Sequence, residues 1–117
     1  MTVKSRLASL VVLGLAAFGP AASANANPQI SEWSDQVDYD QAACVDHARA
    51  AFAQEGWDHI AVANKWVVSA DKGGLSGLIV CLYSSDSQAE PVVFVAGGDG
   101  DLGSNEGLHL KHDMFGK

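Results

Sequence analysis

The chain has 117 residues, a length that fits one small domain, and it carries 14 acidic but only 7 basic side chains. The formal net charge of −7 argues against nucleic acid and anionic membranes as partners, because both are bound through clustered Lys and Arg. A basic protein or a cation complements such a chain better.

The first 26 residues have the pattern of a secretory signal peptide. Lys4 and Arg6 precede an apolar run at 7–18, and small residues follow it. These small residues suit cleavage after Ala24 or after Ala26, and we predict cleavage after Ala26. The run is shorter than the roughly 20 apolar residues that span a bilayer; a buried helix and an uncleaved anchor are the alternatives. We expect export to the periplasm or the cell exterior, with no membrane attachment after cleavage.

Cleavage at this point changes both the size and the charge of the domain. Removing 26 of 117 residues leaves 91, and losing both leader cations leaves 5 basic against 14 acidic side chains, a formal charge of −9. We expect residues 27–37 to form an extended N-terminal arm anchored by Trp33. Residues 38–117 are expected to form a single small α+β domain.

Cys44 and Cys81 are the only cysteines of the chain. In an oxidising compartment, an even number of cysteines in a short chain predicts a disulfide. Such a disulfide would stabilise the fold by about 3–4 kcal/mol, because it lowers the conformational entropy of the unfolded chain. A metal-bound thiol pair or a reactive cysteine is the alternative, although the spacing is not C-x-x-C.

One helix is predicted from Gln41 to Glu55. The segment is rich in Ala, its apolar residues recur every three or four positions, and Cys44 lies within that stripe. Asp38 or Asp40 can cap its first turn, and Gly56 is expected to end it.

Three strands are predicted beyond the helix, at 60–70, 77–83 and 92–96, because the apolar period there changes to two. Short turns between successive strands favour antiparallel pairing. The predicted fold class is therefore α+β, with one N-terminal helix packed on a three-stranded antiparallel meander. We predict a short C-terminal helix at 108–115, and a strand is the alternative for these residues.

The middle predicted strand has two apolar faces. A bridge to the helix places Cys81 on the helix side with Ile79 and Tyr83, so Leu78, Val80 and Leu82 point the other way. That second face is too apolar for ordinary solvent exposure. Either the C-terminal residues or the Trp33 arm cover it, or it is an interface with a protein partner or a second copy.

The glycine-rich segment 97–107 is predicted as a loop. Its acids Asp99, Asp101 and Glu106 make it a candidate cation loop, because calcium takes several oxygen ligands. The spacing departs from the EF-hand pattern, so a solvated loop is the alternative.

The C-terminal segment offers soft metal ligands. His109 and His112 share one helical face with Met114 nearby, which suits copper or zinc, with His47, His59 or Asp113 as further donors.

The chain contains no G-x-S-x-G, H-E-x-x-H, P-loop or dinucleotide-binding motif, so we expect no enzymatic activity. We expect a small exported acidic protein that acts as a non-enzymatic binding, adaptor or inhibitor module without a cofactor. An exported copper- or zinc-binding protein is the first alternative, and a plain scaffold is the second.

Overall fold

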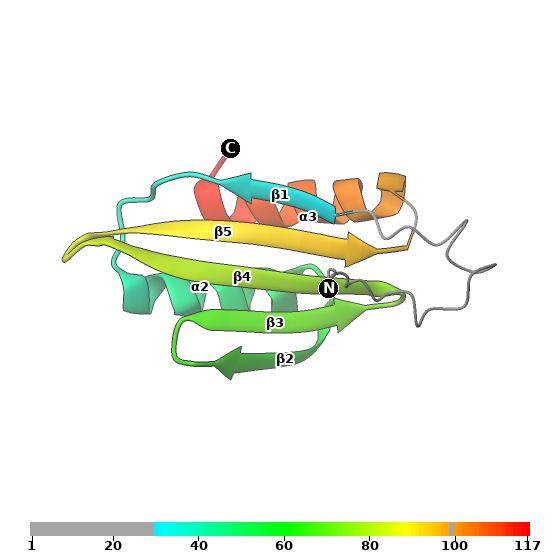
Figure 1. The fold of residues 1–117 in the computed structure, drawn as a ribbon, viewed down its shortest axis with the longest axis horizontal. Helices are drawn as coiled ribbons and strands as arrows, with labels where there is room; N and C mark the ends of the chain where they lie inside the picture. Colours follow the sequence, from blue (N-terminus) through cyan, green and yellow to red (C-terminus); the bar gives the residue numbers. More distant parts are fainter. Residues whose placement is uncertain (1–29, 99) are drawn as a thin grey trace, which may run out of the picture.

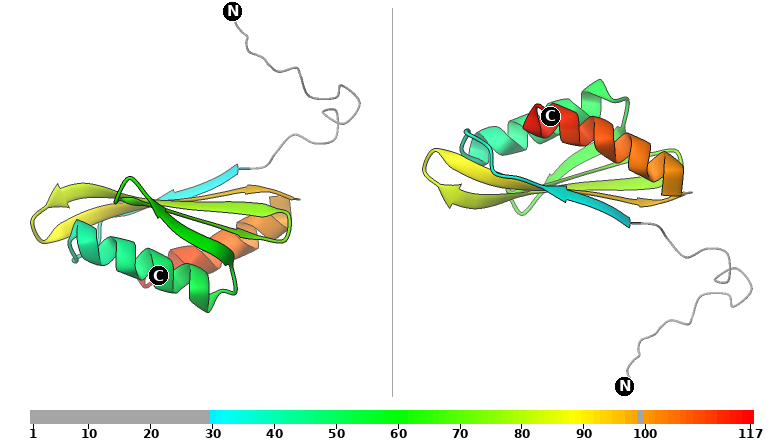
Figure 2. Two further views of the ribbon diagram at one scale, coloured as in Figure 1. Left: turned by 90° about the horizontal axis from the view of Figure 1, so that it is seen from below. Right: turned by 90° about the horizontal axis from the view of Figure 1, so that it is seen from above.

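The computed structural model describes residues 30–98 and 100–117, so the predicted signal peptide and Asp99 lie outside the described residues. The fold is α+β, with two helices on one face of a five-stranded antiparallel sheet (Figures 1 and 2). Along the chain, the elements are β1 (Ile30–Ser34), α2 (Gln41–Gln54), β2 (Asp58–Ala63), β3 (Val67–Lys72), β4 (Leu75–Ser85), β5 (Gln88–Gly97) and α3 (Gly100–Phe115). The order across the sheet is β1-β5-β4-β3-β2.

The predicted three-stranded meander behind an N-terminal helix is wrong in strand number and in order. The arm forms β1, which precedes the helix and pairs with β5 from Ile30 opposite Ala96 to Ser34 opposite Val92. This short polar segment gains its partners from the far end of the chain, so its own sequence does not indicate a strand.

The predicted strand at 60–70 is two strands joined by a tight turn. Asn64 and Lys65 adopt positive φ angles of 52° and 69° there, and β2 then folds back on β3 with Ala63 opposite Val67. Alternating apolar residues continue through the turn without Gly or Pro, which hides the turn from a pattern analysis.

Helix α3 replaces most of the predicted glycine-rich loop. It begins at Gly100, well before the predicted helix at 108–115, and it runs for 16 residues. Its Gly107 faces the Trp33 ring so closely that even a Cβ would collide with it. Glycine lowers helix propensity by about 1 kcal/mol, but here it lets the helix approach β1, and tertiary packing outweighs propensity.

Helix α2 follows its predicted pattern closely. The Asp40 side chain accepts a hydrogen bond from the Ala43 amide at 2.8 Å, which identifies Asp40 as the cap. Beyond Gly56, the Trp57 amide donates to the Phe52 carbonyl at 3.0 Å. The two aromatic rings meet edge to face at 5.2 Å, so the helix end is closed by aromatic packing.

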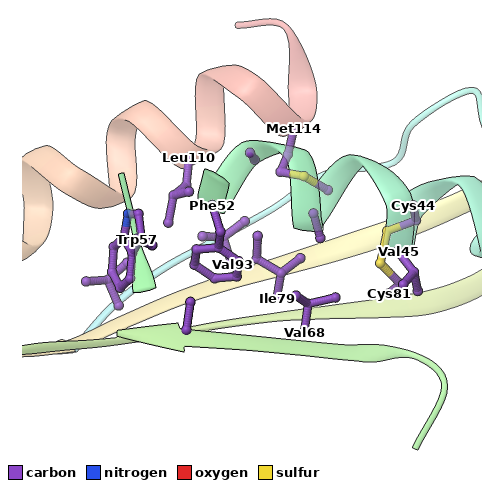
Figure 3. Close-up of a cluster of buried hydrophobic side chains, with 14 of the residues drawn as sticks. Cys44, Val45, Phe52, Trp57, Val68, Ile79, Cys81, Val93, Leu110 and Met114 are labelled. Atoms are coloured by element: carbon purple, nitrogen blue, oxygen red, sulfur yellow. A yellow bond between two sulfur atoms is a disulfide. The ribbon is translucent and has the colours of Figure 1, made fainter. Parts of the chain in front are cut away.

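The core lies between the two helices and the sheet (Figure 3). Phe52 of α2, Ile79 of β4, Val93 of β5 and Leu110 of α3 are all fully buried there. At one end of this core, Cys44 and Cys81 form the predicted disulfide, with Cα atoms 5.9 Å apart. The disulfide ties the first turns of α2 to β4.

Candidate binding surface

The sheet has an inner face, covered by α2 and α3, and an opposite outer face (Figure 2). Leu78, Val80 and Leu82 of β4 lie on the outer face, because they alternate with the core residues Ile79 and Cys81. Helix α3 lies on the inner face, and Trp33 packs against α3. Within the described residues, the C-terminal segment therefore lies on the inner face, and the arm extends the sheet as its edge strand β1 instead of covering the outer face.

Neighbouring strands extend the apolar surface around the predicted residues. Phe94 lies opposite Leu78, and Val92 lies opposite Val80. Val92 is only 9% exposed although it does not belong to the core cluster, so its neighbours on the outer face shield it. We call the following residues the outer patch: Ile30, Val67, Leu78, Val80, Leu82, Val92 and Phe94.

The outer patch contains a shallow groove of about 490 Å³. Ile30, Leu78, Phe94 and Ala96 supply its apolar lining, and Asp71 and His59 lie among its polar lining residues. Its volume falls in the range of about 300–1,000 Å³ that is typical of ligand pockets. The groove is large enough to hold an amino-acid side chain.

An ion pair lines one part of this groove. His59 has a positive φ of 55°, and its Nδ1 lies 3.1 Å from both carboxylate oxygens of Asp71. The hydrogen bond with Asp71, and then the charge of Asp71, raise the pKa of His59. The sequence alone does not predict this pair, because the two residues are 12 positions apart and meet only through β2–β3 pairing.

The pair gives a direct prediction for the titration of His59. Asp71→Asn is expected to bring the pKa of His59 down towards its ordinary value of 6.5, as measured by NMR of the imidazole protons. The pair stabilises the fold below pH 6.5, and that contribution disappears as the pH rises through the raised pKa. Asp58→Asn is the control, since Asp58 acts on His59 only weakly through its charge. An unchanged pKa in Asp71→Asn would rule out the described pairing.

Two serines, Ser69 and Ser76, also line the groove near the His59–Asp71 pair. A serine nucleophile needs a hydroxyl hydrogen-bonded to the imidazole, which must in turn be oriented by a carboxylate. Within the described residues, His59 bonds to Asp71 only. The pair is therefore not connected to a serine.

The predicted metal ligands do not converge. His109 and His112 are exposed on α3, whereas the Met114 side chain is 2% exposed and belongs to the core. The Tyr39 hydroxyl donates to the Met114 carbonyl at 2.7 Å, and burial raises the pKa of Tyr39 to about 12. Across residues 30–98 and 100–117, no group of three or more His, Cys, Asp or Glu side chains is arranged to hold a metal ion.

The predicted cation loop is largely helical. Asp101 lies in the first turn of α3, where a carboxylate suits the positive end of the helix dipole. Glu106 accepts a hydrogen bond from Lys72 Nζ at 2.9 Å. Because five helical positions correspond to a rotation of about 140°, these two acids point in different directions. Asp99 lies outside the described residues.

A second group of charges joins α3 to the end of α2. Lys72 Nζ also donates to the Glu55 carbonyl at 2.6 Å, and His109 Nδ1 lies 3.4 Å from Glu55 Oε1. The Glu55 carboxyl contacts that of Asp113, and this hydrogen bond, followed by burial, raises the pKa of Glu55. One Asp113 oxygen, Oδ2, is buried without an N–H or O–H donor from the described residues. The Glu55 carboxyl therefore holds its proton more tightly in the folded protein than in the unfolded chain.

The raised pKa of Glu55 predicts a pH dependence of stability. Because the folded protein binds the Glu55 proton more tightly than the unfolded chain, stability falls as the pH rises from the ordinary value of 4.5 through the raised pKa of Glu55. Asp113→Asn supplies an amide donor and is expected to reduce this loss, as measured by urea unfolding at about pH 4.5 and pH 7. The exposed Asp46→Asn is the control and is expected to keep the wild-type dependence. Equal pH dependence in Asp113→Asn and wild type would contradict the pairing.

Comparisons of the chain with models of known protein families, with curated protein sequences and with solved structures find no match. Among the described residues, no helix has both the length and the apolar character to span a bilayer.

Proposed function

We propose that this protein is an exported, non-enzymatic binding module, an adaptor or inhibitor that docks a protein partner on its outer sheet face. The proposal rests on the observation that both helices pack on the inner face, so neither described helix covers the outer patch (Figure 2). Antiparallel sheets usually present polar residues on an uncovered face. A continuous apolar surface in that place is typical of an interaction site.

The disulfide supports the exported setting. The bridge between Cys44 and Cys81 is compatible with folding in an oxidising compartment, as is the signal peptide pattern of residues 1–26. The disulfide and the rigid sheet also hold the outer patch in a fixed shape. A preorganised surface loses less conformational entropy on binding.

Two exposed leucines provide a matched test of the proposed surface. Leu82 on the outer face and Leu108 on α3 are 45% and 44% exposed. A photoreactive p-benzoylphenylalanine in place of Leu82 is expected to crosslink to a protein partner in the native host, whereas the same residue in place of Leu108 is not. Crosslinking at Leu108 alone, or at neither position, would contradict the proposal.

A further inference from the structure

The outer face carries negative charge around its apolar centre. Glu32 lies opposite Phe94, Asp71 lies opposite Ser76 and Glu90 lies opposite Leu82, so all three carboxylates share the face with the outer patch. They belong to three different strands, β1, β3 and β5. The acidic groups therefore flank the apolar surface rather than gather at one point.

The cations of the described chain lie elsewhere. Lys72 reaches Glu55 and Glu106 on the helix side of the sheet, and Lys117 pairs with Asp35 at 2.8 Å. Lys65 lies over the Trp66 ring in the turn between β2 and β3. Arg49 and Lys111 belong to α2 and α3. No Lys or Arg within the described strands therefore neutralises the carboxylates of the outer face.

This charge pattern disfavours a second copy as the occupant. In a two-fold pairing, the same surface meets itself, so Glu32, Asp71 and Glu90 of one copy would meet a surface that carries carboxylates and no described strand Lys or Arg to pair with them. Like charges placed together across an interface weaken it. An apolar surface with an acidic margin is complementary to an apolar surface with a basic margin.

We propose that the groove receives an apolar side chain of a partner protein, flanked by Lys or Arg residues that pair with Asp71 and Glu32. This inference rests on the proposed function and adds the chemistry of the partner to it. Phe94 and Leu78 supply the apolar contact for the inserted side chain. The carboxylates select a cationic neighbour and increase the rate of encounter.

His59 makes this recognition sensitive to pH. Its imidazole already lies 3.1 Å from Asp71, and Asp58 is the other carboxylate that acts on it. A protonated His59 neutralises Asp71 and competes with the partner's cation. Acidification is therefore expected to weaken binding, because it protonates His59, whose pKa the hydrogen bond with Asp71 already raises.

Three short peptides test the inference without knowledge of the native partner. The probe is acetyl-Lys-Phe-Lys-amide, and the controls are acetyl-Glu-Phe-Glu-amide and acetyl-Lys-Ser-Lys-amide. Each is titrated into the oxidised, isotope-labelled protein, and binding is followed by amide chemical shifts. We expect the probe to shift the amides around Leu78 and Phe94 and to bind more tightly than either control.

Substitutions then separate charge from apolar contact. We expect Phe94→Ser to raise the Kd of the probe at least about 5-fold, and Asp71→Asn or Glu32→Gln to raise it about 2- to 5-fold each. The matched control Asp46→Asn, on the exposed side of α2, is expected to leave the Kd unchanged. Lowering the pH from about 8 to about 5.5 is expected to weaken binding to wild type but not to His59→Ala.

The outcomes distinguish this inference from the proposed function. If acetyl-Glu-Phe-Glu-amide binds the groove as tightly as the probe, the inferred charge preference is wrong but the surface remains a binding site. If the probe binds only at α2 or α3, or if no peptide binds, the inferred site is wrong. The proposed function fails separately, when photocrosslinking at Leu82 captures no partner.

Discussion

Removal of the disulfide is expected to lower the free energy of unfolding by about 3–4 kcal/mol. The bridge joins residues 37 positions apart, so its loss frees a long loop in the unfolded chain. Small domains have only about 5–15 kcal/mol of stability in total, so this loss is a large share. It also releases α2 from β4, which supplies part of the outer patch.

The measurement is urea unfolding of the oxidised protein, the reduced protein and the double variant Cys44→Ala with Cys81→Ala. Both cysteines are at most 1% exposed, so alanine avoids burying an unpaired hydroxyl. The reduced protein isolates the effect of the bond, and the alanine variant adds the loss of side-chain volume. A change below about 1 kcal/mol on reduction would contradict the stabilising role given to the bridge.

Leu110→Ala is expected to cost about 2–5 kcal/mol, whereas Leu108→Ala is expected to cost no more than about 0.5 kcal/mol. Leu110 is fully buried on the core side of α3, and Leu108 is 44% exposed on the same helix. Leucine and alanine have similar helix propensities, so the difference reports packing. The comparison tests whether α3 is an integral part of the inner layer.

The same pair distinguishes a helix from the strand alternative at the C-terminal end. In a strand, residues two apart share a face, so both substitutions would have similar effects. In α3, they are separated by about 200° around the axis. Urea unfolding of the two single variants is the measurement, and equal losses would contradict the helical packing of residues 100–115 described here.

Local signals were sufficient for α2 and for the disulfide. The Asp40 cap, the alanine-rich stripe and the stop at Gly56 are all properties of a continuous segment. The pairing of Cys44 with Cys81 needed only the cysteine count and the compartment implied by the leader pattern. These features depend little on the rest of the fold, which explains why sequence alone could predict them.

The remaining elements depend on contacts between distant segments. Segment β1 forms a strand by pairing with β5 at the edge of the sheet. Helix α3 contains several glycines, and Gly107 allows it to pack closely against Trp33 of β1. The turn at Asn64 uses positive φ angles without glycine. Helix propensity and apolar period cannot report such tertiary effects.

The outer face was only partly foreseeable. Alternation around Cys81 predicted the outward direction of Leu78, Val80 and Leu82, and their role as an interface stays a prediction. Tyr83 was expected on the helix side, but it lies outside the core and is 63% exposed. Its hydroxyl donates a hydrogen bond to the Asp86 carboxylate. The groove required the order of all five strands, because each of them contributes to its lining.

Hydroxyl-radical footprinting shows whether the outer face is open in the isolated protein and covered by a partner in the native host. The protein is compared alone and in the exported fraction of its native host, with Leu82 read against the equally exposed Leu108. We predict similar modification of both leucines in the isolated protein, and protection of Leu82 alone in the native fraction. Protection of Leu82 already in the isolated monomer, or unchanged modification in the native fraction, would contradict this prediction.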